Sequence, residues 1–224
     1  TPISYLARAA AFFGERTAVV HGQRRYTYRD LYARSRRLAH ALTKAGVKRG
    51  DTVAIIAPNV PAMLEAHYGV PMIGAVLNPV NIRLDAGAIA FCLEHGEAKL
   101  VLADREFHQT VAPALEKLGS KKPIVIDIAD ADTAGAPHFG SIEYEDFVAA
   151  GDPDFVYSGP EDEWDSICLL YTSGTTGNPK GAVYSHRGAY LGALSNAMTF
   201  KLDHESRYLW TLPMFHCSGW TFTW

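Results

Sequence analysis

The residues most suited to chemistry lie between Tyr171 and Gly181, in the sequence YTSGTTGNPKG. Four serine or threonine hydroxyls, three glycines and one lysine, Lys180, fall within this stretch. Glycines let backbone N–H groups come close to an anion, and successive N–H groups form a concave anion-binding surface. The hydroxyls add hydrogen-bond donors and the lysine adds a mobile positive charge. The segment therefore predicts a loop that binds a triphosphate.

Two common nucleotide-binding motifs do not fit this loop. A Walker A loop has Gly directly before Lys and Ser or Thr directly after it, whereas Pro179 precedes Lys180 and Gly181 follows it. The chain contains no G-x-G pair, so the dinucleotide-binding fingerprint is absent. Glycine, serine, threonine, asparagine and proline are also ordinary residues of surface turns. Composition alone therefore leaves a flexible surface turn as an alternative.

The order of residues in this loop resembles the signature of the adenylate-forming enzymes, Y/F-T-S-G-T-T-G-x-P-K-G, without interruption. That family includes acyl-CoA synthetases, luciferases and the adenylation domains of peptide synthetases. Residues 26–31, 46–54 and 213–216 are also similar to segments of the family. Residues 74–84 (GAVLNPVNIRL) resemble the acyl-CoA synthetases in particular. The resemblance therefore extends along most of the chain.

The resemblance implies a two-step reaction. ATP and a carboxylic acid give an acyl-adenylate and pyrophosphate, and a thiol, usually that of coenzyme A, then displaces AMP. Because an anionic carboxylate attacks an anionic phosphate, catalysis has to come from positioning and charge neutralisation. The loop is implied to hold the β- and γ-phosphates, with Mg²⁺ bridging their oxygens, and Lys180 is the first catalytic candidate. The residues carried over as ATP-binding are Thr172, Ser173, Gly174, Thr175, Thr176, Gly177 and Lys180.

His216 and Trp220 are the candidates for the acyl side of the site. By the resemblance, His216 is a catalytic residue that orients the acyl oxygen or offsets charge near the α-phosphate, and Trp220 lines or gates the acyl pocket. The alternative for each is a place in the packed core. Ser218 stands where related sequences usually have Asn, and its shorter side chain is expected to reshape the pocket. The string FHCSGW and residues 184–190 resemble synthetases for short, medium-chain or small substituted acids, which implies an acid of that kind.

Residues 17–128 alternate between strand and helix patterns, which predicts the elements that position the loop. The residues at 52–57 (TVAIIA) are apolar without alternation, as in a strand covered on both faces. Strand–helix–strand repeats of this length require crossover connections and a mostly parallel sheet, so the fold expected is a layered α/β domain. Strands are expected at 17–21, 25–28, 52–57, 75–80, 99–103 and 123–128, and helices at 31–45, 61–72, 85–95 and 106–118. Asn59 is expected to cap the helix at 61–72.

Two stretches rich in Gly, Pro and acidic residues, 129–141 and 151–165, are expected to be loops. They divide the chain into a first α/β subdomain, 1–150, and the start of a second one, 151–224. The elements expected in the second are strands at 166–171, near 182–184 and at 208–212, and a helix at 187–199. His186 and Arg187 are expected to be helix-start residues without a role in chemistry.

Composition disfavours several other classes of protein. The chain has 224 residues, 48% of them hydrophobic, and a net charge of -3, which favours a globular protein over a general nucleic-acid binder. No apolar run approaches the roughly 18 residues of a membrane helix. The three cysteines are far apart, which predicts a reducing compartment, here the cytoplasm. The nine histidines include no pair spaced for zinc, so no metal-ligating protein residues are predicted.

The chain is expected to be an N-terminal fragment of an acid–CoA ligase. The family's adenine- and ribose-binding segments, its hinge and its small C-terminal domain with a catalytic lysine do not occur in it. The apolar residues at 213–224 are expected to lack their covering, so the fragment is expected to be inactive alone and to self-associate there. The alternatives are an adenylation enzyme that serves a carrier protein, a luciferase-like enzyme, and a self-contained nucleotide-binding α/β module.

Overall fold

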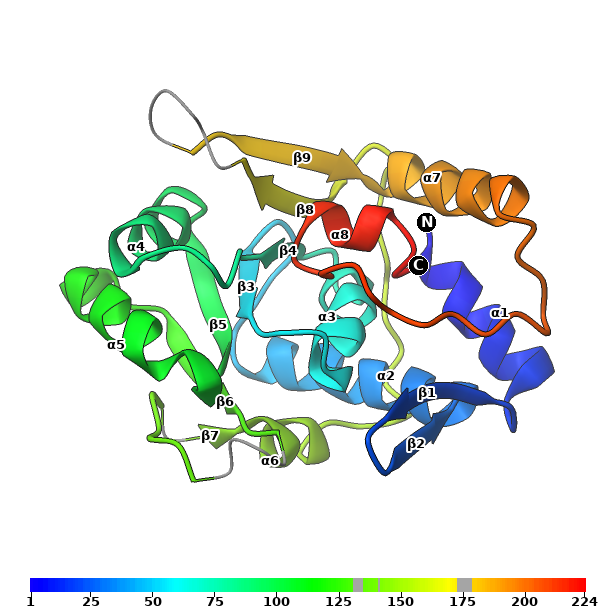
Figure 1. The fold of residues 1–224 in the computed structure, drawn as a ribbon, viewed down its shortest axis with the longest axis horizontal. Helices are drawn as coiled ribbons and strands as arrows, with labels where there is room; N and C mark the ends of the chain where they lie inside the picture. Colours follow the sequence, from blue (N-terminus) through cyan, green and yellow to red (C-terminus); the bar gives the residue numbers. More distant parts are fainter. Residues whose placement is uncertain (131–134, 141, 173–178) are drawn as a thin grey trace.

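A seven-stranded sheet forms the centre of the computed structural model, which describes residues 1–130, 135–140, 142–172 and 179–224 (Figure 1). The strands are β3 (Thr52–Ile56), β4 (Val76–Pro79), β5 (Ala98–Asp104), β6 (Ile124–Ile128), β7 (Ile142–Glu143), β8 (Ser166–Tyr171) and β9 (Gly181–Ser185). Their order is β7-β6-β5-β3-β4-β8-β9, and every neighbouring pair is parallel except β8 and β9. The mostly parallel α/β fold predicted from the sequence is confirmed.

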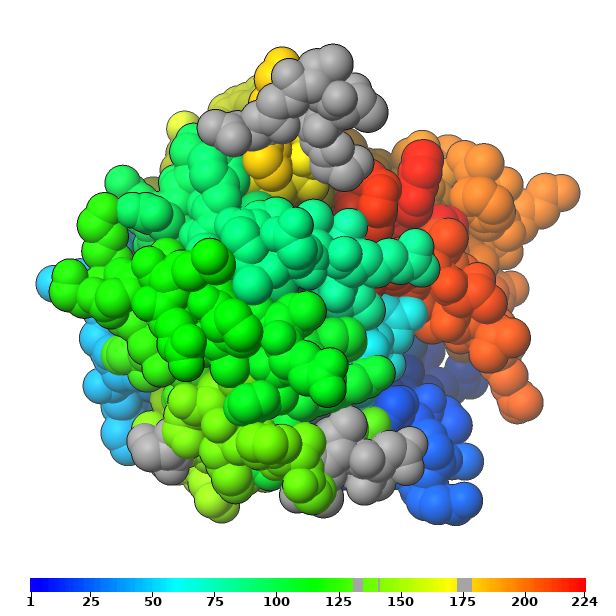
Figure 2. Space-filling model, turned by 60° about the vertical axis from the view of Figure 1, so that its left-hand side comes forward, coloured from blue at the N-terminus to red at the C-terminus, as the bar shows by residue number. Residues whose placement is uncertain are grey.

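Helices cover both faces of the sheet. One face packs against α2 (Tyr28–Lys44), α3 (Pro61–Met72) and α6 (Tyr144–Ala149), and the other against α4 (Ala86–His95) and α5 (His108–Lys117). Figure 2 shows the surface formed by α4 and α5, with the last residues of the chain, in red, beside it. Val53 and Ile55 of β3 belong to the first core, and Ala54 and Ile56 belong to the second. All of them are fully buried, which is why this strand shows no polar alternation.

Local signals set several helix ends. Thr27 Oγ1 accepts a hydrogen bond from the Asp30 N–H at 3.1 Å, and the Asp30 carboxylate accepts one from the Thr27 N–H at 2.9 Å. This reciprocal pair is a capping box, and it fixes the start of α2. The Asp85 carboxylate accepts a single hydrogen bond from the Ala88 N–H at 2.8 Å and caps the start of α4. Gly46, just after α2, has φ +86°, the left-handed backbone expected of a helix-ending glycine.

The hairpin β1 (Thr17–His21) and β2 (Arg24–Thr27) turns at Gly22 and Gln23 as predicted. The sequence did not predict α1 (Ile3–Phe13), β7 or α6. Two short 3-10 turns, η1 (Arg105–Phe107) and η2 (Gly119–Lys121), flank α5.

The predicted helix after β9 is α7 (His186–Thr199). Ser185 caps it by accepting from the Gly188 N–H at 3.1 Å. His186 is buried, and its Nδ1 lies 2.8 Å from Thr1 Oγ1. Arg187 forms an ion pair with Glu163 at 2.6 Å. These contacts agree with the structural roles predicted for the two residues that start the helix.

The strand predicted at 208–212 is absent, and this expectation is wrong. The Tyr208 ring stacks on Phe222 at 5.0 Å between centroids and meets Trp210 edge-on at 5.1 Å. The Trp224 indole N–H donates to the His67 carbonyl at 3.0 Å. The apolar pattern of this segment therefore reflects packing of aromatic rings and not pairing in a ladder. Phe222 and Trp224 are half-buried through these contacts, whereas Trp220 is 62% exposed, and the self-association expected at 213–224 stays a prediction.

The two predicted subdomains share the sheet. Leu77 of β4 lies opposite Cys168 of β8 in a parallel ladder, so a strand from 151–224 continues the sheet built by 1–150. The position of the boundary between them stays a prediction. Within the described ranges, no helix is both long enough and apolar enough to span a membrane.

Candidate phosphate-binding site

The predicted phosphate loop follows β8 in the sequence and precedes β9, and the carboxyl end of β8 is its first described boundary (Figure 1). Tyr171 pairs with Gly181 in the antiparallel ladder, and beyond this pair the Thr172 N–H donates to the Lys180 carbonyl at 2.9 Å. Thr172 and Lys180 are thus held side by side. In open α/β sheets ligands bind outside the carboxyl ends of the strands, so these two residues lie where a ligand site is expected.

Two of the predicted ATP-binding residues, Thr172 and Lys180, belong to the described part of the chain, and both are exposed. Lys180 makes no ion pair with any other described residue. Its ammonium group is therefore available to an anion at the end of the loop. The other predicted residues of the loop, which lie outside the described residues, are Ser173, Gly174, Thr175, Thr176 and Gly177.

Asn59 brings the segment before His216 to the same edge of the sheet. Its Nδ2 donates to the Leu212 carbonyl at 2.8 Å, and its Oδ1 accepts from the Met214 N–H at 2.8 Å. The prediction that Asn59 caps α3 is wrong: the N-cap residue is Val60, which has no side-chain cap. Both polar atoms of the Asn59 amide are hydrogen-bonded to residues 212 and 214, so the side chain does not cap the helix. This role leaves no signal in the local sequence.

In the complete protein, Asn59→Ala should lower the free energy of unfolding by about 1–3 kcal/mol, because it leaves two backbone groups without partners. The control is Asn81→Ala, which removes a turn contact to the Arg83 N–H. Denaturant unfolding measures the loss of stability in each variant. Equal losses in both variants would contradict the role of Asn59.

A left-handed turn, α8 (Cys217–Trp220), follows His216. The residues from Cys217 to Thr221 all have φ between +47° and +64°, and among them only Gly219 adopts this conformation freely. Each of the others costs about 1–2 kcal/mol. Asn196 of α7 holds the turn by donating to the Trp220 carbonyl at 2.6 Å and to Thr221 Oγ1 at 3.0 Å. Such strain is typical of functional segments that the surrounding structure keeps in place.

A cleft of about 550 Å³ lies between β9, α7 and this turn. The residues that line it are Val183, Tyr184, Ser185, Gly188, Gly192, Ser195, Asn196, Cys217, Trp220 and Thr221. Trp220, which the sequence predicted at the acyl pocket, lines this cleft. His216 is exposed and does not line it. The structure therefore places Trp220 on the wall of a cavity and His216 just outside it.

Tyr184, which lines this cleft, is held in its neutral form. Burial and the neighbouring Cys217 thiol raise the pKa of Tyr184 to about 12. The phenol therefore keeps its proton at neutral pH, and this part of the wall suits an uncharged group. Cys168 does not line the cleft, and burial raises its pKa to about 12, against the effect of its contact with the Ser218 hydroxyl at 3.3 Å. Ser218 is fully buried and does not line the cleft either, so its expected effect on the pocket stays a prediction.

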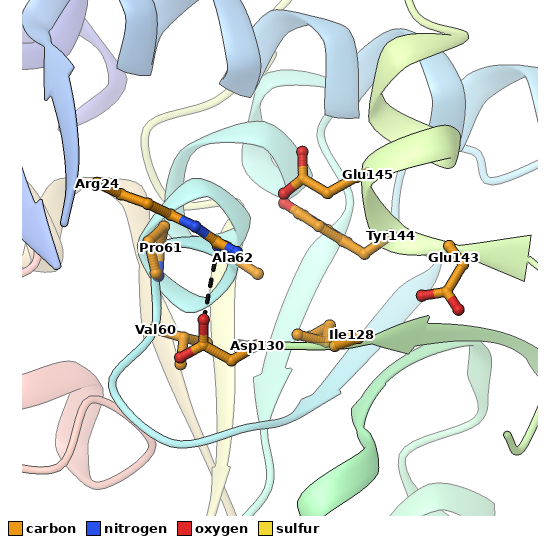
Figure 3. A pocket seen from close by; sticks show the side chains of 10 residues that line it. Arg24, Val60, Pro61, Ala62, Ile128, Asp130, Glu143, Tyr144 and Glu145 are labelled. Carbon is orange, nitrogen blue, oxygen red and sulfur yellow. Dashed lines mark ion pairs between the residues drawn. The ribbon is translucent and has the colours of Figure 1, made fainter. Parts of the chain in front are cut away.

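A second cavity, of about 30 Å³, lies at the end of β6 and has room for about one water molecule (Figure 3). Arg24 of β2 reaches across it to Asp130 at 3.6 Å, and His21 Nε2 lies 2.7 Å from the same carboxylate. Ion pairs thus fasten the first hairpin to the sheet. This cavity is too small for a nucleotide or an acid, so it is not the candidate site.

The sequence model of one protein family, described as AMP-binding enzyme, matches residues 6–224. The chain belongs to the AMP-binding enzyme family. Among the described residues of the chain, no group of three or more His, Cys, Asp or Glu side chains is arranged to hold a metal ion.

Curated relatives match the whole chain but are much longer. The acetate/butyrate–CoA ligase AAE7 of Arabidopsis thaliana, peroxisomal by its name, is 52% identical over 100% of this chain and 41% of its own length. The acetate–CoA ligase CCL3 of Humulus lupulus is 49% identical, over 100% of this chain and 41% of its own length. The chain thus spans about two fifths of the length of these relatives.

Solved structures share the fold. A long-chain-fatty-acid–CoA ligase from Archaeoglobus fulgidus superposes with a TM-score of 0.83 at 23% identity, over 99% of this chain and 44% of the ligase chain. The O-succinylbenzoate coenzyme A synthetase of Bacillus subtilis, solved in complex with AMP, gives a TM-score of 0.77 at 26% identity, over 98% of the chain and 41% of its own.

Proposed function

We propose that the complete protein is an acid–CoA ligase. It joins ATP and a carboxylic acid into an acyl-adenylate and then transfers the acyl group to the thiol of coenzyme A. The observation that carries this proposal is the 52% identity, over the whole chain, to a relative named as an acetate/butyrate–CoA ligase. The loop between β8 and β9, with an exposed and unpaired Lys180 among the described residues, supports the first step.

In this proposal the loop binds the β- and γ-phosphates of ATP, and Lys180 neutralises charge on the departing pyrophosphate. Mg²⁺ bound with ATP would supply Lewis-acid stabilisation of the phosphate charge. Thr172 would hold it, since its hydroxyl is exposed at the start of the loop and oxygen is the donor that Mg²⁺ prefers. His216 orients the carboxylate for attack. Binding and orientation by these side chains supply most of the rate increase, because the reaction joins two anions.

The acid proposed is a short- or medium-chain acid or a small substituted one. The cleft beside Trp220 has a volume of about 550 Å³, and the Tyr184 phenol on its wall is neutral. Three relatives carry names that specify acetate or butyrate. Small residues on α7, Gly188 and Gly192, leave room along one wall.

Trp220→Ala in the complete protein should shift preference toward longer acids, because it removes the largest side chain on the wall of the cleft. Each added methylene that gains a buried place should improve kcat/KM by about threefold to fourfold. The measurement is a series of kcat/KM values for acids of increasing length. Phe12→Ala removes another exposed aromatic side chain, on α1, and serves as the control. An unchanged length profile in Trp220→Ala would refute the assignment.

The complete protein, with ATP, Mg²⁺, coenzyme A and a panel of C2 to C12 acids, provides the test of the proposed function. The expected results are acid-dependent exchange of labelled pyrophosphate into ATP and formation of acyl-CoA. Exchange without acyl-CoA would favour an enzyme that serves a carrier protein or a luciferase-like enzyme. Nucleotide binding without any exchange would favour a binding module, and the ligase proposal would then be wrong.

We also propose that the protein works in a reducing compartment, with the cytoplasm as the first candidate. All three cysteines are free, and two of them, Cys92 and Cys168, are buried. Several relatives carry names that place them in the peroxisome. Imaging of the tagged complete protein distinguishes the two locations.

A further inference from the structure

Tyr171, the last residue of β8, makes a hydrogen bond that the proposed reaction does not use. Its hydroxyl lies 2.8 Å from Nδ1 of His95, at the end of α4. Phe91, one helical turn earlier, stacks on the His95 ring at 5.2 Å between centroids and meets the Tyr171 ring edge-on at 6.3 Å. Three rings therefore join the last turn of α4 to the residue directly before the phosphate loop.

The backbone that follows His95 passes close to this pair. A Cβ added to Gly96 would lie 3.2 Å from the Tyr171 hydroxyl and also 3.2 Å from Nδ2 of Asn78. Glycine at this position permits the close approach. Asn78 of β4 is fully buried, and neither polar atom of its side chain has a hydrogen-bond partner among the described residues. A buried amide without a partner is costly, and this amide approaches the same side of Gly96 as the Tyr171 hydroxyl.

The Tyr171 hydroxyl is suited to two hydrogen bonds at once. Burial and the nearby Cys92 raise the pKa of Tyr171 to about 12, so the hydroxyl keeps its proton at neutral pH. A protonated phenol donates one hydrogen bond and also accepts. It is therefore able to donate to His95 Nδ1 and to accept from the Asn78 amide.

We propose that His95 and Asn78 are positioning residues for the phosphate loop, and that both act through the Tyr171 hydroxyl. His95 holds the hydroxyl before ATP binds, and Asn78 supplies the second hydrogen bond when ATP draws the end of β8 toward the phosphates. The inference rests on the proposed binding of ATP by this loop. The family signature admits Tyr or Phe at this position, so positioning through the hydroxyl is a property of this chain.

Tyr171→Phe and His95→Leu should each raise the KM for ATP about five- to tenfold, which is the effect of one lost hydrogen bond. The kcat and the KM for the acid should change less than twofold, because neither residue touches the acid. His95→Asn places a polar atom near the position of Nδ1 and should restore the KM for ATP to within about twofold. A purely structural role would lower stability without separating the two KM values. Tyr32→Phe is the matched control, since it removes a hydroxyl contact with Tyr157 at 3.3 Å in another part of the fold.

The role of Asn78 requires a double-mutant cycle. Asn78→Ala should raise the KM for ATP about threefold to fivefold with Tyr171 in place, and should have no further effect in Tyr171→Phe. Equal effects in both backgrounds would show that Asn78 acts by packing and would overturn its part of the inference.

Calorimetric titration with ATP separates this inference from the proposed function. If the complete protein shows no acid-dependent exchange, the proposed function fails, and weaker ATP binding by Tyr171→Phe and His95→Leu still supports positioning. If exchange is present and both variants bind ATP as the unchanged protein does, the positioning inference is overturned while the ligase proposal stands.

Discussion

Lys180→Ala in the complete protein should slow acid-dependent exchange of pyrophosphate into ATP by about a hundredfold or more. The side chain is exposed at the end of the loop and makes no ion pair with another described residue. In the proposed reaction its charge would meet the negative charge that develops on the leaving pyrophosphate, an interaction stronger in the transition state than in the ground state. The substitution keeps the Lys180 carbonyl, which accepts from the Thr172 N–H, so the frame of the loop is preserved.

Two further variants make this result specific. Lys180→Arg keeps the charge and should retain part of the exchange rate. Lys122→Ala removes an exposed lysine that precedes β6, at the opposite edge of the sheet, and should leave the rate unchanged. A rate for Lys180→Ala within twofold of the unchanged protein would remove Lys180 from the mechanism.

His216→Ala should lower the same exchange by about tenfold to a hundredfold while leaving thioester formation from a supplied acyl-adenylate nearly unchanged. The histidine is proposed to act only while the carboxylate approaches the α-phosphate. Its side chain is exposed and makes no hydrogen bond to another described residue, so its removal leaves no buried group unpaired. Separate assays of the two half-reactions measure the difference.

His204→Ala is the control for this experiment, because it removes another exposed histidine, one that contacts Glu205 at 3.4 Å. Both half-reactions should proceed normally in that variant. If His216→Ala loses both half-reactions equally, damage to the fold explains the loss, and the proposed role in adenylation is wrong.

The parallel sheet was predictable because its signals are local. A short run of neighbouring residues is enough to predict each element. The apolar run of β3 indicates a buried strand, the capping box of Thr27 and Asp30 marks the start of α2, and Gly46 marks its end. The helix α1 lacks such signals, since it has no side-chain cap and no acidic residue in its first turn. The strand β7 has only two residues and depends on β6 for its pairing.

The candidate site was predictable only where residue order carries the chemistry, as in the loop that ends at Lys180. The attachment of residues 212–214 through Asn59 joins positions more than 150 residues apart, and no local pattern encodes it. The left-handed turn from Cys217 to Thr221 contains only one glycine, so its backbone conformation has no signature in the residue types. The expected strand at 208–212 failed for a related reason, because aromatic residues suit ring packing as well as a ladder.

The place of β8 in the sheet has a consequence for how this protein is made. The strands β3 to β7 are all encoded before residue 144, yet β4 pairs with β8, about 90 residues further along the chain. At ribosomal speeds of about 5–20 residues per second, the open edge of β4 waits several seconds for its neighbour. The hairpin of β8 and β9 therefore joins the sheet after β3 to β7 have been made, and a nascent chain stalled before β8 presents an unpaired parallel edge that is prone to aggregate.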